Sequence, residues 1–212
     1  MRVIFVLVCA LLPLRAEIID RIAITAGPQV ITELQLDEEL RVAALLNHQP
    51  IDRSVSARRA AADRLIEQLL IKREMDVSHF PPPQPGEIDR FVEQVRTAIA
   101  ATGNFDETLR RYNLSESVLR EHLAMQLTTL QFIEFRFRPE LGVSPADIET
   151  YYQGELARWR AERAGAKPPT LAEEREPIRH KLAEQRTDQA LDAWLAESRK
   201  QVAIAYLDKT LE

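Results

Sequence analysis

Apolar and polar residues alternate near the start of the chain as they do in a half-buried β-strand. Ile22, Ile24 and Ala26 occupy every second position, which is the two-residue period of a strand with one buried face. Gly27-Pro28 interrupts the run, because glycine tolerates positive φ and proline fixes φ while lacking an N–H group. Val30-Ile31 then resumes the apolar pattern. The stretch 20–34 therefore predicts a β-hairpin.

The same period returns at the far end of the chain. Val202, Ile204 and Tyr206 alternate with the residues between them, up to Leu207. An isolated two-stranded hairpin is marginal in water, so the N-terminal hairpin needs a further strand or a helical cover. We expect residues 202–207 to supply that third strand, so that one domain is closed by both ends of the chain.

Between these ends the apolar positions recur at helical spacing, and polar residues suited to helix N-capping precede the runs. This pattern predicts a mainly α fold, a multi-helix domain with a small β-sheet formed by the N-terminal hairpin and the C-terminal strand. Pro177 must kink the last helix or delay its start. The expected helix starts are Thr32 with Gln35, Ser54 or Ser56, a third helix around Ile88–Ile99, Asn104 with Glu107, Ser115, Ser144-Pro145, and Thr170 with Glu173.

A proline-rich segment, His79–Pro85, separates two of the expected helices and cannot itself be helical. Two interpretations fit it. It is a polyproline ligand for a partner with a groove, or a stiff surface loop between helices.

The helix expected after Ser115 ends in a cluster of aromatic residues. Phe132, Phe135 and Phe137 point in three directions at ~100° per residue. Three directions cannot all face one core, so at least one phenylalanine is a candidate for an exposed binding surface.

The first residues look like an export signal. Arg2 is followed by the apolar run Val3–Leu12, then Pro13 and the small residue Ala16. The run is about half the ~20 residues that a membrane span needs. We therefore expect residues 1–16 to be a cleavable signal peptide, with the exact cut open, and residues 17–212 to be a periplasmic domain without stable membrane insertion.

The composition of the chain argues against several kinds of functional site. The single cysteine, Cys9, lies in the expected signal, and the six glycines are scattered and form no phosphate-binding loop. The four histidines have no metal-ligand spacing, and His122 is expected to be a partly buried structural residue. A net charge of −5 argues against nucleic acid as a partner. We expect no cofactor, no metal and no catalytic residues, so the protein is not expected to be an enzyme.

Four segments together resemble the SurA-like periplasmic chaperones. Asp20–Ile24 with Val30–Thr32 is similar to the mature start of that family, and Leu65–Leu70 resembles its second long helix. Val143–Tyr152 resembles the segment before the parvulin prolyl isomerase domain, and Ile178–Leu207 resembles the helix and strand after it. The resemblance spans nearly the whole mature chain in order.

The chain departs from this family where the isomerase should be. Residues 161–170 are far too few for a domain, which needs ~50 residues or more. The resemblance therefore implies one chaperone domain without isomerase activity. Its N-terminal helical part is 17–161, a linker at 162–170 stands in place of the parvulin domain, and the C-terminal helix and strand at 171–212 complete it.

The resemblance and the phenylalanine cluster predict an ATP-independent holdase that binds unfolded outer-membrane proteins in an apolar groove. The alternatives are a structural or assembly subunit that holds a fixed partner or dimerises by exchanging its C-terminal helix, and a prolyl isomerase with an unrecognised site. The oligomeric state, monomer or dimer, stays open. The candidate peptide-binding residues are Leu119, Leu123, Leu127, Leu130, Phe132, Phe135, Phe137, Tyr151 and Trp194.

Overall fold

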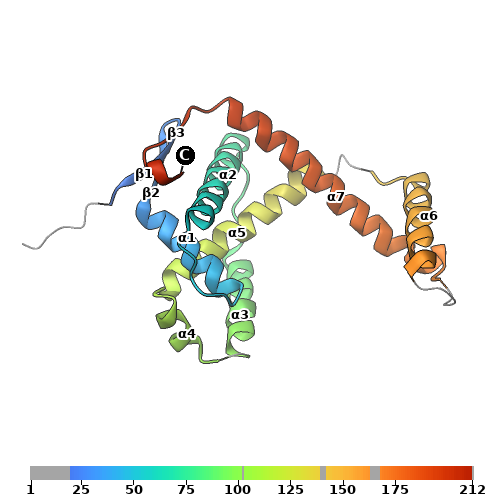
Figure 1. Cartoon of the computed structure of the whole chain (residues 1–212), viewed down its shortest axis with the longest axis horizontal. Coiled ribbons are helices and arrows are strands. Elements are labelled where there is room, and N and C mark those ends of the chain that lie inside the picture. Colours follow the sequence, from blue (N-terminus) through green and yellow to red (C-terminus); the bar gives the residue numbers. More distant parts are fainter. Residues whose placement is uncertain (1–19, 102, 139–141, 163–167, 212) are drawn as a thin grey trace, which may run out of the picture.

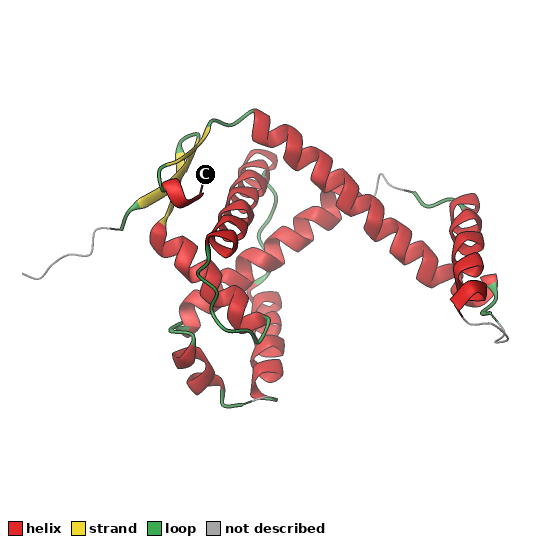
Figure 2. Ribbon diagram, in the orientation of Figure 1, coloured by secondary structure: helices red, strands yellow, loops and turns green. Residues whose placement is uncertain are grey.

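A computed structural model describes residues 20–101, 103–138, 142–162 and 168–211 (Figure 1). Helices dominate this part of the chain, and the three strands lie together near its two ends (Figure 2). The mainly α fold with a small sheet is thus confirmed, whereas the expected signal at 1–16 lies outside the described residues. The elements are β1 (Ile22–Ala26), β2 (Gln29–Thr32), α1 (Glu33–Leu46), α2 (Val55–Ser78), α3 (Pro85–Ala100), α4 (Phe105–Arg111), α5 (Glu116–Phe137), α6 (Pro145–Glu162), α7 (Leu171–Lys200), β3 (Ile204–Tyr206) and the short 3-10 helix η2 (Lys209–Leu211).

The sheet joins the beginning and the end of the described chain. Its strand order is β2-β1-β3, and β1 is antiparallel to both neighbours. Ala26 pairs with Gln29 on one side and with Ile204 on the other. The predicted meeting of the hairpin with a C-terminal strand is therefore confirmed.

The hairpin turn depends on its glycine. Gly27 has φ of +59°, and a positive φ followed by the fixed negative φ of Pro28 fits a two-residue type II′ turn. The Gly27 amide donates to the carbonyl of Ala203 at 2.9 Å. The turn therefore binds the C-terminal segment directly.

Strict alternation fails inside β1. The pairing register with β2 shifts between Ile22 and Ile24, and Ala23 and Ile24 are both fully buried while Ile22 is 45% exposed. The reason is a β-bulge, which turns two successive side chains toward one face. The Ala23 carbonyl accepts hydrogen bonds from the amides of Leu207 and Asp208 at 2.8 and 3.2 Å, so the C-terminal segment is bound at the bulge.

Most predicted helix starts are confirmed by their caps. Thr32 and Gln35 form a reciprocal capping box, as do Thr170 and Glu173. The side chains of Ser54, Asn104, Ser115 and Ser144 each accept a backbone N–H bond from the first turn of their helix.

Two proline positions differ from the sequence-based expectation. α3 begins at Pro85, because proline is well suited to the first helical position, where no N–H partner is needed. α7 begins at Leu171 and runs through Pro177. The proline therefore does not delay the helix.

Most of the buried apolar residues form two clusters that share α1 and α5. The first lies between the sheet, α1, α2, the C-terminal half of α5 and the end of α7, and includes Ile24, Ile66, Phe132 and Leu195. The second lies between α1, α3, α4 and the N-terminal half of α5. Its members are Val42, Leu45, Val92, Ile99, Phe105, Leu109, Leu114, Leu119 and Leu123.

α5 uses opposite faces in its two halves. Leu119 and Leu123 pack in the second cluster, whereas Phe132 packs in the first. At ~100° per residue, Leu130 lies about 20° from Leu119 around the helix and about 160° from Phe132. The leucine face of the N-terminal half therefore continues along α5 past the helices that cover it.

The N-terminal half of α7 projects from the body and carries α6 at its far end (Figure 1). α6 packs against α7, and no other described element has a comparable contact with it. Arg186 fastens the start of α6 to α7. Its guanidinium lies 2.9 Å from Oδ2 of Asp147 and donates to the Gly142 carbonyl at 2.6 Å.

Candidate functional site

Four of the nine predicted peptide-binding residues lie in the protein interior. Leu119, Leu123, Phe132 and Phe137 are 6% exposed or less, so a peptide cannot reach their side chains in this conformation. The sequence-based expectation is corrected here. These residues were selected for their apolar periodicity, which is the signature of core packing. They hold α5 in place from inside the protein and are not part of its exposed surface.

Leu127 and Leu130 remain accessible on the same face of α5. Leu130 is 49% exposed and Leu127 is half-buried. Their face is the one that α3 and α4 cover at Leu119 and Leu123. An uncovered continuation of a buried helix face leaves apolar area in water, which is the usual mark of a binding surface when it is contiguous.

Phe135 lies on a different side of α5. It is 65% exposed, and its ring centroid is 5.5 Å from that of Phe80. Phe80 in turn makes an edge-to-face contact with buried Phe132, with centroids 5.3 Å apart. Val77, near Phe80 in sequence, is 69% exposed. One phenylalanine of the three is thus exposed, in agreement with the prediction that they cannot all face one core.

The proline-rich segment is anchored at both ends. Phe80 packs against two rings of α5, and Pro83 is buried, whereas Pro81 and Pro82 are exposed. These contacts support the interpretation as a stiff loop between α2 and α3. They leave two prolines at the surface.

Trp194, another predicted site residue, helps to hold α7 on the body. Its ring centroid lies 6.1 Å from that of Phe137 at the end of α5, and its side chain is half-buried beside the first cluster. This aromatic pair connects the two helices, so Trp194 supports the geometry of the surface.

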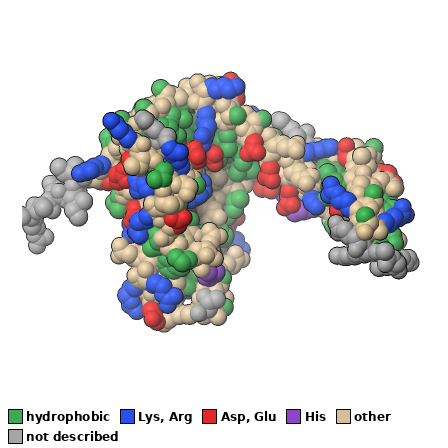
Figure 3. Space-filling model, viewed as in Figure 1, with side chains coloured by type: hydrophobic (Ala, Val, Ile, Leu, Met, Phe, Trp, Pro, Cys, Tyr) green, Lys and Arg blue, Asp and Glu red, His purple; other side chains and the backbone are tan. Residues whose placement is uncertain are grey.

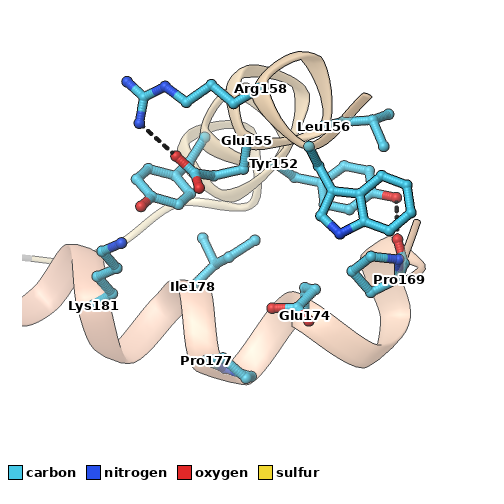
Figure 4. A pocket seen from close by; sticks show the side chains of 11 residues that line it. Tyr152, Glu155, Leu156, Arg158, Pro169, Glu174, Pro177, Ile178 and Lys181 are labelled. Atoms are coloured by element: carbon cyan, nitrogen blue, oxygen red, sulfur yellow. Dashed lines mark hydrogen bonds and ion pairs between the residues drawn. The ribbon is translucent and has the colours of Figure 1, made fainter. Parts of the chain in front are cut away.

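The remaining predicted residue, Tyr151, lines a groove. Figure 4 shows this groove between α6 and the first turns of α7. The groove has a volume of about 530 Å³. Apart from Tyr151, the sequence-based list missed its residues. The spacing of Tyr152, Leu156 and Trp159, at i, i+4 and i+7 on a helix, is the signal that identifies this stripe. The groove is lined by Tyr151, Tyr152, Glu155, Leu156, Arg158, Trp159, Pro169, Glu174, Pro177, Ile178 and Lys181.

Hydrogen bonds and charge contacts fix the groove's polar residues. The Tyr152 hydroxyl donates to the Pro169 carbonyl at 2.7 Å, across the two helices. The Lys181 ammonium lies 5.2 Å from the centre of the Tyr151 ring. A hydrogen bond with the Tyr151 hydroxyl raises the pKa of Lys181 above its ordinary value.

The molecule is concave between the body and α6. The space-filling view shows an open bay below α7, bordered by the body on one side and by α6 on the other (Figure 3). The exposed end of the leucine face on α5 points to the side from which α3 projects, because Leu119 and Leu123 contact that helix.

The described residues contain no group of three or more His, Cys, Asp or Glu side chains placed to hold a metal ion. His122 is half-buried, with Nε2 3.5 Å from Oε2 of buried Glu39. Oε1 of Glu39 accepts a 2.6 Å hydrogen bond from Arg64. These three groups link α1, α2 and α5, which agrees with the structural role expected for His122. No helix in the described part of the chain has the length and apolar character of a membrane span.

No protein-family model matches the chain, and no curated protein matches it. The resemblance to the SurA-like chaperones therefore stays a prediction from the quoted segments.

Proposed function

We propose that this protein is an ATP-independent holdase that acts in the periplasm on unfolded outer-membrane proteins. The client segments bind by burying apolar side chains on the exposed faces of α5. Leu127 and Leu130 form one contact area, and Phe135 with Phe80 forms the other.

One observation carries this proposal. Leu130 and Phe135 stay 49% and 65% exposed on a helix whose residues Leu119, Leu123 and Phe132 are buried in the two apolar clusters. Water-exposed leucine and phenylalanine on a rigid, packed helix gain free energy when another apolar chain covers them. Their scaffold is already ordered, so the cost of arranging this side of the complex is small.

The magnitudes suit reversible binding. A client segment that buries ~500 Å² of apolar area gains ~12 kcal/mol at 25 cal/mol/Å². Loss of translational freedom and ordering of the chain remove ~4–15 kcal/mol of this gain. The balance is weak binding, which lets a client leave without ATP.

The bay below α7 supports the same proposal, because it offers room for an extended segment between the body and α6 (Figure 3). The resemblance to the SurA-like chaperones implies a periplasmic location and outer-membrane proteins as clients. Prolyl isomerisation is not part of the proposed activity, since the interval 161–170 is too short to contain an isomerase domain.

The direct test is suppression of aggregation. An outer-membrane barrel protein unfolded in urea is diluted into buffer with a several-fold molar excess of this protein, and light scattering is followed. We expect scattering to fall as the ratio of holdase to client rises. Unchanged scattering at that excess would contradict the proposal.

A second candidate function rests on the arm, which is α6 together with the N-terminal half of α7 (Figure 1). Because α6 packs mainly against α7, an exchanged α6–α7 hairpin would build a dimer at low cost, and the protein would then act as an assembly subunit. Multi-angle light scattering separates the two functions. A monomer favours the holdase, and a dimer that resists dilution favours the assembly subunit.

A further inference from the structure

The α6–α7 groove holds a concentration of amphipathic aromatic residues. The chain has two tryptophans and four tyrosines, and three of these six, Tyr151, Tyr152 and Trp159, line this one groove. All three are half-buried. Tryptophan and tyrosine with one face in water are the residues that most often dominate binding energy at peptide and protein interfaces.

The groove also carries opposite charges on α7. Lys181 and Glu174 both line it, and neither takes part in an ion pair within the described residues. The other charged lining residues, Arg158 and Glu155, neutralise each other at 2.9 Å. Figure 4 shows Lys181 and Glu174 on either side of Ile178, with Glu174 on the side of Pro169. One end of the groove therefore offers a cation and the other a carboxylate.

The separation of these charges sets a ligand length. Glu174 and Lys181 are seven helical steps apart, which is ~10 Å at 1.5 Å per residue. An extended chain rises ~3.3 Å per residue, and a polyproline II chain rises ~3.1 Å. Two complementary charges on an extended ligand would therefore stand about three residues apart.

We propose that the α6–α7 groove binds an extended peptide with an acidic residue at Lys181 and a basic residue three positions away at Glu174. Apolar residues or prolines between them pack against the half-buried side chains of Tyr151, Leu156 and Trp159. Opposite charges at the two ends select the ligand, and the aromatic walls supply the apolar contact. This site is separate from the surfaces on α5 and does not depend on the holdase function.

Fluorescence polarisation of a labelled peptide tests the proposal on the full chain. The probe is a short peptide with Glu-Pro-Leu-Lys at its centre. The comparison peptides carry Gln-Pro-Leu-Gln, Lys-Pro-Leu-Lys, or the same four residues with the two charges adjacent. We expect saturable binding of the probe, and binding at least about tenfold weaker for each comparison peptide.

A single charge reversal sharpens the test. Lys181→Glu makes both ends of the groove acidic, so this variant is expected to lose the Glu-Pro-Leu-Lys probe and to prefer the Lys-Pro-Leu-Lys peptide. Lys200→Glu makes the same change of net charge at the far end of α7, where the side chain is 72% exposed. It is expected to bind all peptides as the unmodified protein does.

Three results would overturn the inference. They are absence of saturable binding up to ~1 mM, equal binding of the charged and Gln-Pro-Leu-Gln peptides, and a Lys181→Glu variant that keeps its original preference. Circular dichroism of both variants shows whether each is folded. Both positions are exposed on the surface of α7, so we expect unchanged spectra.

Discussion

Nη2 of Arg58 lies 2.7 Å from Oδ2 of Asp208, although the two residues are 150 positions apart in the sequence. The same nitrogen lies 2.7 Å from Oε2 of Glu33. One guanidinium on α2 thus holds the first helix and the C-terminal segment together, beside the strand pairing that joins the same two parts.

Removing this guanidinium is expected to weaken the closure of the domain. Arg58→Met leaves two partly buried carboxylates without their cation, and we expect a loss of about 1–3 kcal/mol in the free energy of unfolding. Urea denaturation measures it. Arg59→Met is the matched control, because Arg59 is exposed and makes no ion pair within the described residues. Equal stability of the two variants would contradict the assigned role.

The same cluster predicts a pH dependence. The backbone amide of Thr210, and then Arg58, lower the pKa of Asp208 from 3.8 to about 2. Because the folded-state pKa lies below the unfolded value, the stabilisation is complete above the unfolded pKa. It is lost as pH falls from about 3.8 through about 2. Asp208→Asn is therefore expected to reduce stability at pH 7, and the difference from the unmodified protein should shrink as pH falls and vanish below about pH 2. A difference that persists unchanged at low pH would contradict this assignment.

Two neighbouring phenylalanines are expected to behave oppositely. Phe132 is fully buried and Phe135 is 65% exposed. Phe132→Ala opens a cavity beside Phe80 and should cost about 3–5 kcal/mol. Phe135→Ala should cost less than about 1 kcal/mol, since it removes only a partial ring contact. Thermal and urea unfolding of both variants measure the contrast, and similar losses would refute the division into core and surface.

The arm offers a local test. Arg186→Met removes the contacts of α7 with Asp147 and the Gly142 carbonyl. Because α6 packs mainly on α7, we expect faster amide hydrogen exchange in α6 without a change in the exchange of α2 or α5. Uniform acceleration across the molecule would show that the arm is not a separate unit of stability.

The sequence contained enough to predict how the ends of the chain meet. Alternation at Ile22–Ala26 and Val202–Tyr206 identified the strands, and side chains such as Thr32 and Asn104 marked helix starts by local hydrogen bonds. These signals act over a few residues, so sequence alone displays them. The bulge at Ala23 escaped prediction because it depends on how β1 pairs with β2.

The candidate surface was less predictable, because the exposure of a side chain depends on contacts with elements that are distant in the sequence. Leu119 and Leu130 share a face of α5 and look alike in the sequence, yet one is 1% exposed and the other 49%. What separates them is where α3 and α4 end in space. The α6–α7 groove likewise needs two helices to be brought together across the chain, and only the stripe of Tyr152, Leu156 and Trp159 hinted at it.

The exposed residues of α5 give the most direct measurement of the proposed function. Light scattering of an unfolded outer-membrane barrel protein is compared for the unmodified protein, a Leu130→Ser/Phe135→Ser variant and a Leu34→Ser control. Leu34 is 50% exposed, against 49% for Leu130, but lies on α1 away from both contact areas. We predict that the unmodified protein and the control suppress scattering equally and that the double variant suppresses it several-fold less. Equal suppression by all three, or by none, would contradict the account.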